Sequence, residues 1–136
     1  MKNTEKIEYI LKELIQNNNP NSIQGAFARN YIVHTSKKDY KGHEIIKRWL
    51  RDLNKYFYDL KIVKIQFLVQ TEEVVVWKRT LKGKIKPSKS NKLVPKKTIK
   101  WDEMVVSKFK DGFIIEEWNT SEFLGELLSK QGFYKN

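Results

Sequence analysis

Two ionisable residues, Arg79 and Glu103, are the first candidates for chemistry in this 136-residue sequence. Each stands in a segment where apolar and polar residues alternate, which predicts a β-strand. Side chains alternate between the two faces of a strand, so both residues are expected on the more apolar face, pointing inward. If residues 84 and 98 close the long hairpin, Arg79 lies directly opposite Glu103. The pair has two interpretations: a buried ion pair that satisfies both charges, or a general base, since burial raises a carboxylate pKa.

His34 is a further candidate, because histidine can act as an acid, a base or an orienting donor. A hydrogen-bonded structural histidine at the rim of a pocket is the alternative. His43 follows a loop glycine at the start of a helix and is expected to be exposed.

Aromatic residues could also form a cage for a planar ligand, although at such periodic positions they often belong to the core. The five candidates are Tyr31, Trp49, Trp77, Trp101 and Trp118. We expect about two of them to line a cavity, with Trp118 first among them.

The composition excludes several kinds of site. The chain has no cysteine, which removes disulfides, thiolate metal sites and a cysteine nucleophile. It has two histidines and contains neither an HExxH motif nor a glycine-rich phosphate loop, so we predict no metal site. No stretch is apolar for long enough to cross a bilayer, and the first residues do not resemble a signal peptide. The expected location is the cytoplasm, without membrane contact.

The net charge of +11 is concentrated between Lys78 and Lys100, a stretch without any acidic residue. Such a surface can attract polyanions. The lysine-rich stretch 84–97 has no interleaved aromatic residues and matches no nucleic-acid motif, so we interpret it as a mobile loop rather than an RNA site. The acidic residues that follow it could balance its charge within the fold or across a homodimer.

The elements that must position these residues follow from hydrophobic periodicity. Helical spacing predicts helices at residues 7–15, 23–27 and 46–57. The period then changes to two, which predicts strands at residues 60–69, 74–84, 98–110 and 113–120, with an Asp-Gly turn between the last two. Ser121 could cap a final helix. We expect the residues that join the layers to be buried: Ile46, Trp49, Leu53, Trp101 and Val105.

Helices followed by a run of antiparallel strands indicate one α+β domain over residues 1–136. The helices should cover one face of a curved sheet, and the space between the two layers is the expected position of a ligand cavity.

Four motifs carry a resemblance to a known family. They are Tyr31-Ile32-Val33-His34-Thr35, similar to Y-x-x-H-N; Gly42 and the helix that leads to Phe57-Tyr58-Asp59-Leu60, similar to G-x-E-G…F-P-D; 74–83, similar to V-x-V-R-x-T-x-x-G; and 109–118, similar to F-x-D-G-K-I-x-E-H-W. Their order and spacing resemble the SnoaL-like polyketide cyclases of the nuclear transport factor two-like superfamily. The resemblance implies a cone-shaped α+β barrel of three to four helices packed on a curved, mostly antiparallel sheet. It also implies a pocket at the open end, a homodimer and no obligatory cofactor.

The same resemblance implies an aspartate acid/base on the third strand and a histidine nearby. Counting back from Asp111, that aspartate position falls on Val105, and the E-H-W-D ending is replaced by residues 116–119, Glu-Glu-Trp-Asn. The family positions of His34 and Trp118, with the inward face of Arg79 and Glu103, lead to the hypothesis that these four side chains converge on one cavity.

Two functions remain open from the sequence. The first is a protein for a small hydrophobic or aromatic ligand, acting as a cofactor-independent isomerase, cyclase or hydrolase by proton transfer. The second is a non-catalytic dimeric binding module whose basic loop recruits an acidic partner or RNA. A titratable group that faces an accessible cavity would favour the first.

Overall fold

The computed structural model describes residues 1–87 and 97–120. The helical elements are α1 (Asn3–Ile15), the 3-10 turn η1 (Pro20–Ser22), α2 (Ile23–Ala26) and α3 (Glu44–Tyr56). The strands are β1 (Phe27–His34), β2 (Asp39–Lys41), β3 (Phe57–Gln70), β4 (Val74–Ile85), β5 (Thr98–Lys110) and β6 (Phe113–Thr120). The lysine-rich stretch at 88–96 and the expected final helix from Ser121 lie outside the described residues.

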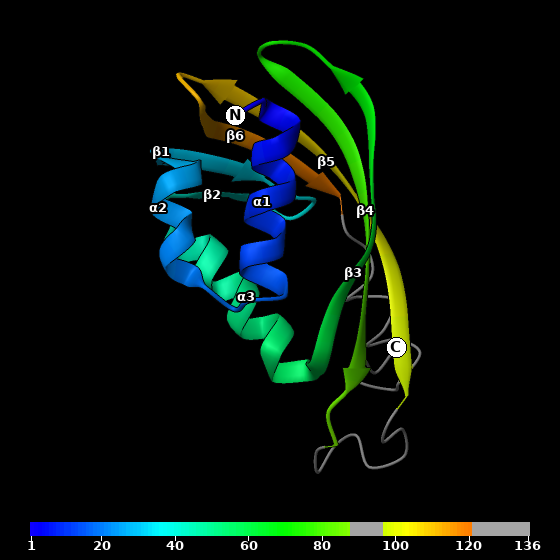
Figure 1. The fold of residues 1–136 in the computed structure, drawn as a ribbon. Coiled ribbons are helices and arrows are strands. Elements are labelled where there is room, and N and C mark those ends of the chain that lie inside the picture. Colours follow the sequence, from blue (N-terminus) through cyan, green and yellow to red (C-terminus); the bar gives the residue numbers. More distant parts are fainter. Residues whose placement is uncertain (88–96, 121–136) are drawn as a thin grey trace.

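All six strands form one sheet in the order β2-β1-β6-β5-β4-β3. Only β1 and β6 pair in parallel, and the other neighbours are antiparallel. The sheet curves around α1, α2 and α3, which lie together on its concave side (Figure 1). The predicted fold class, three helices packed on a curved and mostly antiparallel sheet, is therefore confirmed.

The curvature has a local cause in β3, whose pairing with β4 shifts register at three places along its length. Each shift adds a residue to one strand, and such bulges bend the strand and increase its twist. One of them lies just before Lys61, where Asp59 adopts a left-handed backbone with φ of 53°. The long β3–β4 hairpin consequently bends around the helices instead of running flat.

Strand β4 and strand β5 pair without interruption, and this register confirms the predicted hairpin. Lys84 lies opposite Thr98 and Arg79 lies opposite Glu103. Burial alternates along both strands, so that the odd-numbered residues of each strand face the helices. The regular alternation of apolar side chains predicted the inward faces of both strands, whereas the register followed from the assumption that residues 84 and 98 close the hairpin.

The core fills the space between the helices and the concave face. Ile46 and Leu53 of α3 are buried there, as are Trp101 and Val105 of β5, all as predicted. Trp49 was also expected in the core but is only half-buried, because it borders a cavity. The expected helix at 23–27 ends at Ala26, since Phe27 already begins β1. None of the described helices is long and apolar enough to cross a membrane.

Candidate functional site

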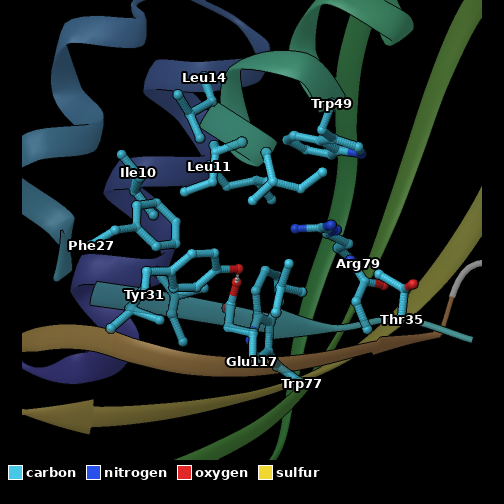
Figure 2. Close-up of a pocket in the computed structure, with 16 residues that line it drawn as sticks. Ile10, Leu11, Leu14, Phe27, Tyr31, Thr35, Trp49, Trp77, Arg79 and Glu117 are labelled. Atoms are coloured by element: carbon cyan, nitrogen blue, oxygen red, sulfur yellow. Dashed lines mark hydrogen bonds between the residues drawn. The ribbon is translucent and has the colours of Figure 1, made fainter. Parts of the chain in front are cut away.

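A cavity of about 150 Å³ lies between the helices and the concave face of the sheet. Helices α1 and α3 supply apolar walls, and strands β1, β4 and β6 supply the polar groups. The lining residues are Ile7, Ile10, Leu11, Leu14, Phe27, Tyr31, Val33, Thr35, Ile45, Ile46, Trp49, Trp77, Arg79, Ile114, Glu117 and Asn119 (Figure 2).

Glu117 is the carboxylate that faces this cavity, and three side chains hold it in place. The Tyr31 hydroxyl donates a hydrogen bond of 2.6 Å to its Oε1 atom (Figure 2). The Ser107 hydroxyl donates to Oε2, and Trp77 Nε1 in turn donates to Ser107 Oγ at 2.9 Å. The Ser107 hydroxyl donates its one hydrogen bond to Glu117 and accepts a hydrogen bond from Trp77. The network therefore fixes both the position and the orientation of the carboxylate.

Burial raises the pKa of Glu117 above its ordinary value. The hydrogen bonds from Ser107 and Tyr31 and the positive charge of Arg79 act in the opposite direction, but desolvation outweighs them. The pKa of Tyr31 is raised well above its ordinary value, first by burial and then by the negative charge of Glu117. Tyr31 therefore remains a hydrogen-bond donor over the whole neutral range. A carboxyl group with a raised pKa inside an apolar pocket is suited to accept and return a proton.

Arg79 forms the other polar side of the cavity. Its guanidinium points into the cavity below Trp49 (Figure 2), with cation–π distances of 4.8 Å to Trp49 and 5.3 Å to Trp77. Its Nε and Nη2 atoms both lie 2.6 Å from Oε1 of Glu103. Glu103 also accepts a bond of 3.0 Å from Trp101 Nε1. Among the described residues, Nη1 of Arg79 has no hydrogen-bond partner, so it can serve a ligand.

Glu103 is 2 % exposed and is not among the residues that line the cavity. It lies behind Arg79, with its charge balanced by the guanidinium. This geometry favours the structural interpretation of the pair, in which Glu103 holds Arg79 in position and Arg79 alone contacts the ligand space. Replacing either partner alone would leave the other charge buried.

His34 and Trp118 do not reach the cavity, so the predicted convergence of four side chains is wrong. Both lie on the outer face of the sheet, where their rings stack with centroids 5.0 Å apart. His34 Nδ1 lies 2.7 Å from Asp39 Oδ1 and Nε2 lies 2.5 Å from Glu116 Oε2. Trp118 is 40 % exposed. Together these four side chains form a surface cluster on the side of the sheet opposite to the helices.

A β-bulge in β6 turns Trp118 outward and Glu117 inward, whereas His34 faces outward because its neighbour Val33 on β1 faces the cavity. Phe109 pairs with Ile114, but the preceding residue, Lys108, pairs with Glu116, so β6 contains one additional residue at this point. The bulge reverses the alternation of faces. Ile114 and Glu117 consequently both face the cavity, whereas regular alternation from Ile114 would have turned Glu117 outward.

The five aromatic candidates divide between three environments. Tyr31, Trp49 and Trp77 line the cavity, which is one more than predicted. Trp101 is buried behind it, stacked on Phe57 with ring centroids 5.2 Å apart. Trp118, expected to be foremost in the cavity, is at the outer surface.

The prediction that His43 is exposed was also wrong. His43 is half-buried, and its Nε2 donates to the carbonyl oxygens of Phe27 and Ala28 at 3.0 and 2.9 Å.

Three further residues belong to the site although sequence patterns did not single them out: Glu117, Ser107 and Asn119. Ser107 shares the inward face of β5 with Glu103 and could have been included on that ground. The bulge changes the face on which Glu117 and Asn119 lie, and no feature of the sequence indicates it. In residues 1–87 and 97–120, no three histidine or acidic side chains gather in a way that could hold a metal ion.

The fold and this cavity define a class: a nuclear transport factor two-like α+β cone with an apolar pocket between helices and sheet. The family model of the SnoaL-like polyketide cyclases matches residues 6–128. The chain belongs to this family. Membership supports a small-molecule-binding, cyclase-like fold.

Solved structures agree with this assignment of the fold. IdmH, a proposed polyketide cyclase from Streptomyces antibioticus, is 16% identical with a TM-score of 0.78, and the match covers 96% of this chain and 99% of IdmH. A proposed polyketide cyclase from Acidithiobacillus ferrooxidans is 19% identical with a TM-score of 0.78, covering 96% of each chain. An NTF2-like protein of unknown function from Burkholderia pseudomallei is 11% identical with a TM-score of 0.73, covering 96% of this chain and 98% of that one. No curated protein matches the sequence.

Proposed function

We propose that this protein catalyses proton transfer on a small carbonyl compound bound in the cavity, with Glu117 as the general base. The observation that carries the proposal is a carboxylate with a raised pKa that faces an apolar cavity shared with an arginine. The reaction class is that of a cofactor-independent isomerase or cyclase. Glu117 takes the place that the sequence analysis gave to Glu103 and His34.

Glu117 and Arg79 have different roles in the proposed reaction. Glu117 removes a proton from the carbon next to the carbonyl group, and the electron pair of the C–H bond moves toward the carbonyl oxygen. Nη1 of Arg79 donates to the oxyanion that develops there, in a cavity whose walls are mostly apolar. Where a double bond lies next to the enolate, the proton returns from Glu117 to the far carbon of the conjugated system, which moves the double bond. Alternatively, the enolate carbon attacks a second carbonyl of the same molecule, and the alkoxide that forms takes the proton from Glu117 as the ring closes.

The supporting side chains keep this arrangement preorganised. Tyr31 and Ser107 fix the two oxygens of Glu117, so the carboxylate does not have to reorient during the reaction. Glu103 fixes two nitrogens of Arg79 and leaves the third directed toward ligand. Fixed donors of this kind stabilise a developing charge more effectively than mobile water.

The test uses cyclohex-3-en-1-one, an uncharged single-ring ketone that becomes conjugated when a proton moves. Isomerisation is followed by ultraviolet absorbance, and incorporation of deuterium from D2O is followed by proton NMR. We expect the wild type to catalyse both, and Glu117→Gln to lower the rate by roughly 10² to 10⁴-fold.

Glu116→Gln is the matched control, because the same substitution one residue earlier changes only the outer face of the sheet. It should leave the rate unchanged. Equal rates for the wild type and Glu117→Gln, or no catalysis by the wild type, would contradict the proposal.

A further inference from the structure

The volume of the cavity limits the size of its ligand. Pockets for drug-sized molecules usually measure about 300–1,000 Å³. The cavity described above, at about 150 Å³, has the size at which an apolar protein interior accommodates one benzene molecule. Its walls are side chains of two helices packed against the sheet, including the large ring of Trp49. A fused multi-ring compound therefore exceeds the space available, and a single ring fits.

Two polar groups of the cavity lack a partner, and they specify what the ligand must carry. Nη1 of Arg79 needs an acceptor, such as a carbonyl oxygen. In the described part of the chain, Oδ1 of Asn119 is buried without any hydrogen-bond partner, and Asn119 lines the cavity. A buried acceptor without a partner costs free energy, so the ligand is expected to supply a donor as well.

The charges around the cavity decide between an uncharged and an anionic ligand. The charges of Arg79 and Glu103 cancel, because the two groups form a close ion pair with 91 % and 98 % of their side chains buried. Among the described lining residues the remaining charge is that of Glu117, whose ionised form is the one needed for a general base. A ligand carboxylate would then be placed beside a second carboxylate in an apolar site, and like charges in such a position repel strongly.

We infer that the pocket selects uncharged carbonyl compounds of about one-ring size that also carry a hydrogen-bond donor, and that Glu117 excludes carboxylates of the same size. The inference rests on the proposed function, because it takes Glu117 in its ionised form. It adds the substrate class: the carbonyl oxygen faces Arg79, the donor faces Asn119, and the ring lies against the apolar walls.

Benzamide and benzoate form a matched pair of probes, equal in size and shape but different in charge. Their dissociation constants are measured by isothermal titration calorimetry at mildly alkaline pH, because a higher pH favours the ionised form of Glu117. For the wild type we expect benzamide to bind at least about tenfold more tightly than benzoate. For Glu117→Gln we expect benzoate to bind at least about tenfold more tightly than it binds the wild type. The reason is that Arg79 can then bind the benzoate carboxylate without repulsion from a second carboxylate. Glu116→Gln should keep the preference of the wild type.

Binding of benzoate to the wild type as tightly as benzamide, or no gain of benzoate on Glu117→Gln, would overturn the inference. Naphthalene-2-carboxamide tests the size limit: it should bind at least about tenfold more weakly than benzamide, and equal affinity would overturn that part. Thermal melting of each variant verifies that the fold is retained.

These outcomes are independent of the proposed reaction, because the readout is binding and not turnover. If the ketone reaction depends on Glu117 but the two probes bind equally, the substrate class is wrong and the function stands. If the probes behave as expected but the ketone does not react, the function is wrong and the charge selection stands.

Discussion

Glu116 and Glu117 are neighbours in β6, yet they belong to two different sites. Glu117 faces the cavity and is held by Tyr31 and Ser107. Glu116 faces the outer surface and contacts His34, which is stacked on Trp118. Both sites contain a group with a raised pKa, but for different reasons: burial for Glu117, and hydrogen bonds to Glu116 and Asp39 for His34.

The comparison shows why residue type alone does not identify a site. The outer cluster has the residues that sequence reasoning associates with catalysis, namely a histidine, two carboxylates and an exposed tryptophan. None of these residues lines the cavity, and both ring nitrogens of the histidine are already engaged by the two carboxylates. Among the described residues, the inner site has one carboxylate that is not paired with a cation, and most of the walls around it are apolar. Position relative to the sheet, and not the kind of side chain, separates the two.

The largest expected effect concerns the buried ion pair of the inner face. Glu103→Gln should lower the free energy of unfolding by about 3–5 kcal/mol, because it removes the carboxylate that pairs directly with the buried guanidinium of Arg79. Urea denaturation followed by circular dichroism measures this loss.

The matched control for this variant is Asp102→Asn, the preceding residue of β5 on the outer face. Asp102 pairs with Lys78 at 3.3 Å, but half of its side chain is exposed. An exposed pair of this kind contributes no more than about 1 kcal/mol. A loss as large for Asp102→Asn as for Glu103→Gln would refute the distinction between the two faces.

A smaller effect is expected from the hydroxyl that supports Glu117. Ser107→Ala removes a donor to Glu117 and the acceptor of the Trp77 N–H, which should cost about 1–3 kcal/mol. In the wild type the hydrogen bond from Ser107 lowers the pKa of Glu117, so its loss in the variant should raise that pKa further. Carboxyl carbon NMR of labelled protein measures the change, and a pKa that stays the same or falls would show that Ser107 does not stabilise the ionised form.

The smallest effect belongs to the outer cluster. His34 has a raised pKa in the folded protein, so its protonated form stabilises the fold. This contribution is fully present below the pKa of an unfolded histidine and is lost as the pH rises through the raised folded value. The stability difference between the wild type and His34→Gln should therefore shrink from mildly acidic to mildly alkaline pH, as urea midpoints would show. The rate of the ketone reaction should be unaffected by His34→Gln. A large loss of rate would show that His34 takes part in the reaction.

Much of the fold could be predicted because its signals are local and regular. The apolar stripes of α1 and α3 and the uninterrupted alternation of β4 and β5 determine the layers and the inward faces. The pairing of Arg79 with Glu103 also required the assumption that residues 84 and 98 close the hairpin, which the structure confirms. The site could be predicted only in part, because the bulge in β6 depends on pairing with β5 and leaves no mark in the sequence. The half-buried state of Trp49 was also not predictable, since a cavity and a filled core use the same apolar pattern.

The pH dependence of the ketone reaction, compared with the titration of Glu117 itself, tests the central claim most directly. A general base acts in its ionised form, so the rate should rise with pH and reach a plateau above the pKa of Glu117. We predict that the midpoint of this rise coincides with the carboxyl carbon titration of Glu117, above the ordinary value of a glutamate, and that both move upward together in Ser107→Ala. A rate that is independent of pH across the titration of Glu117, or a midpoint that does not follow it in the variant, would contradict the account.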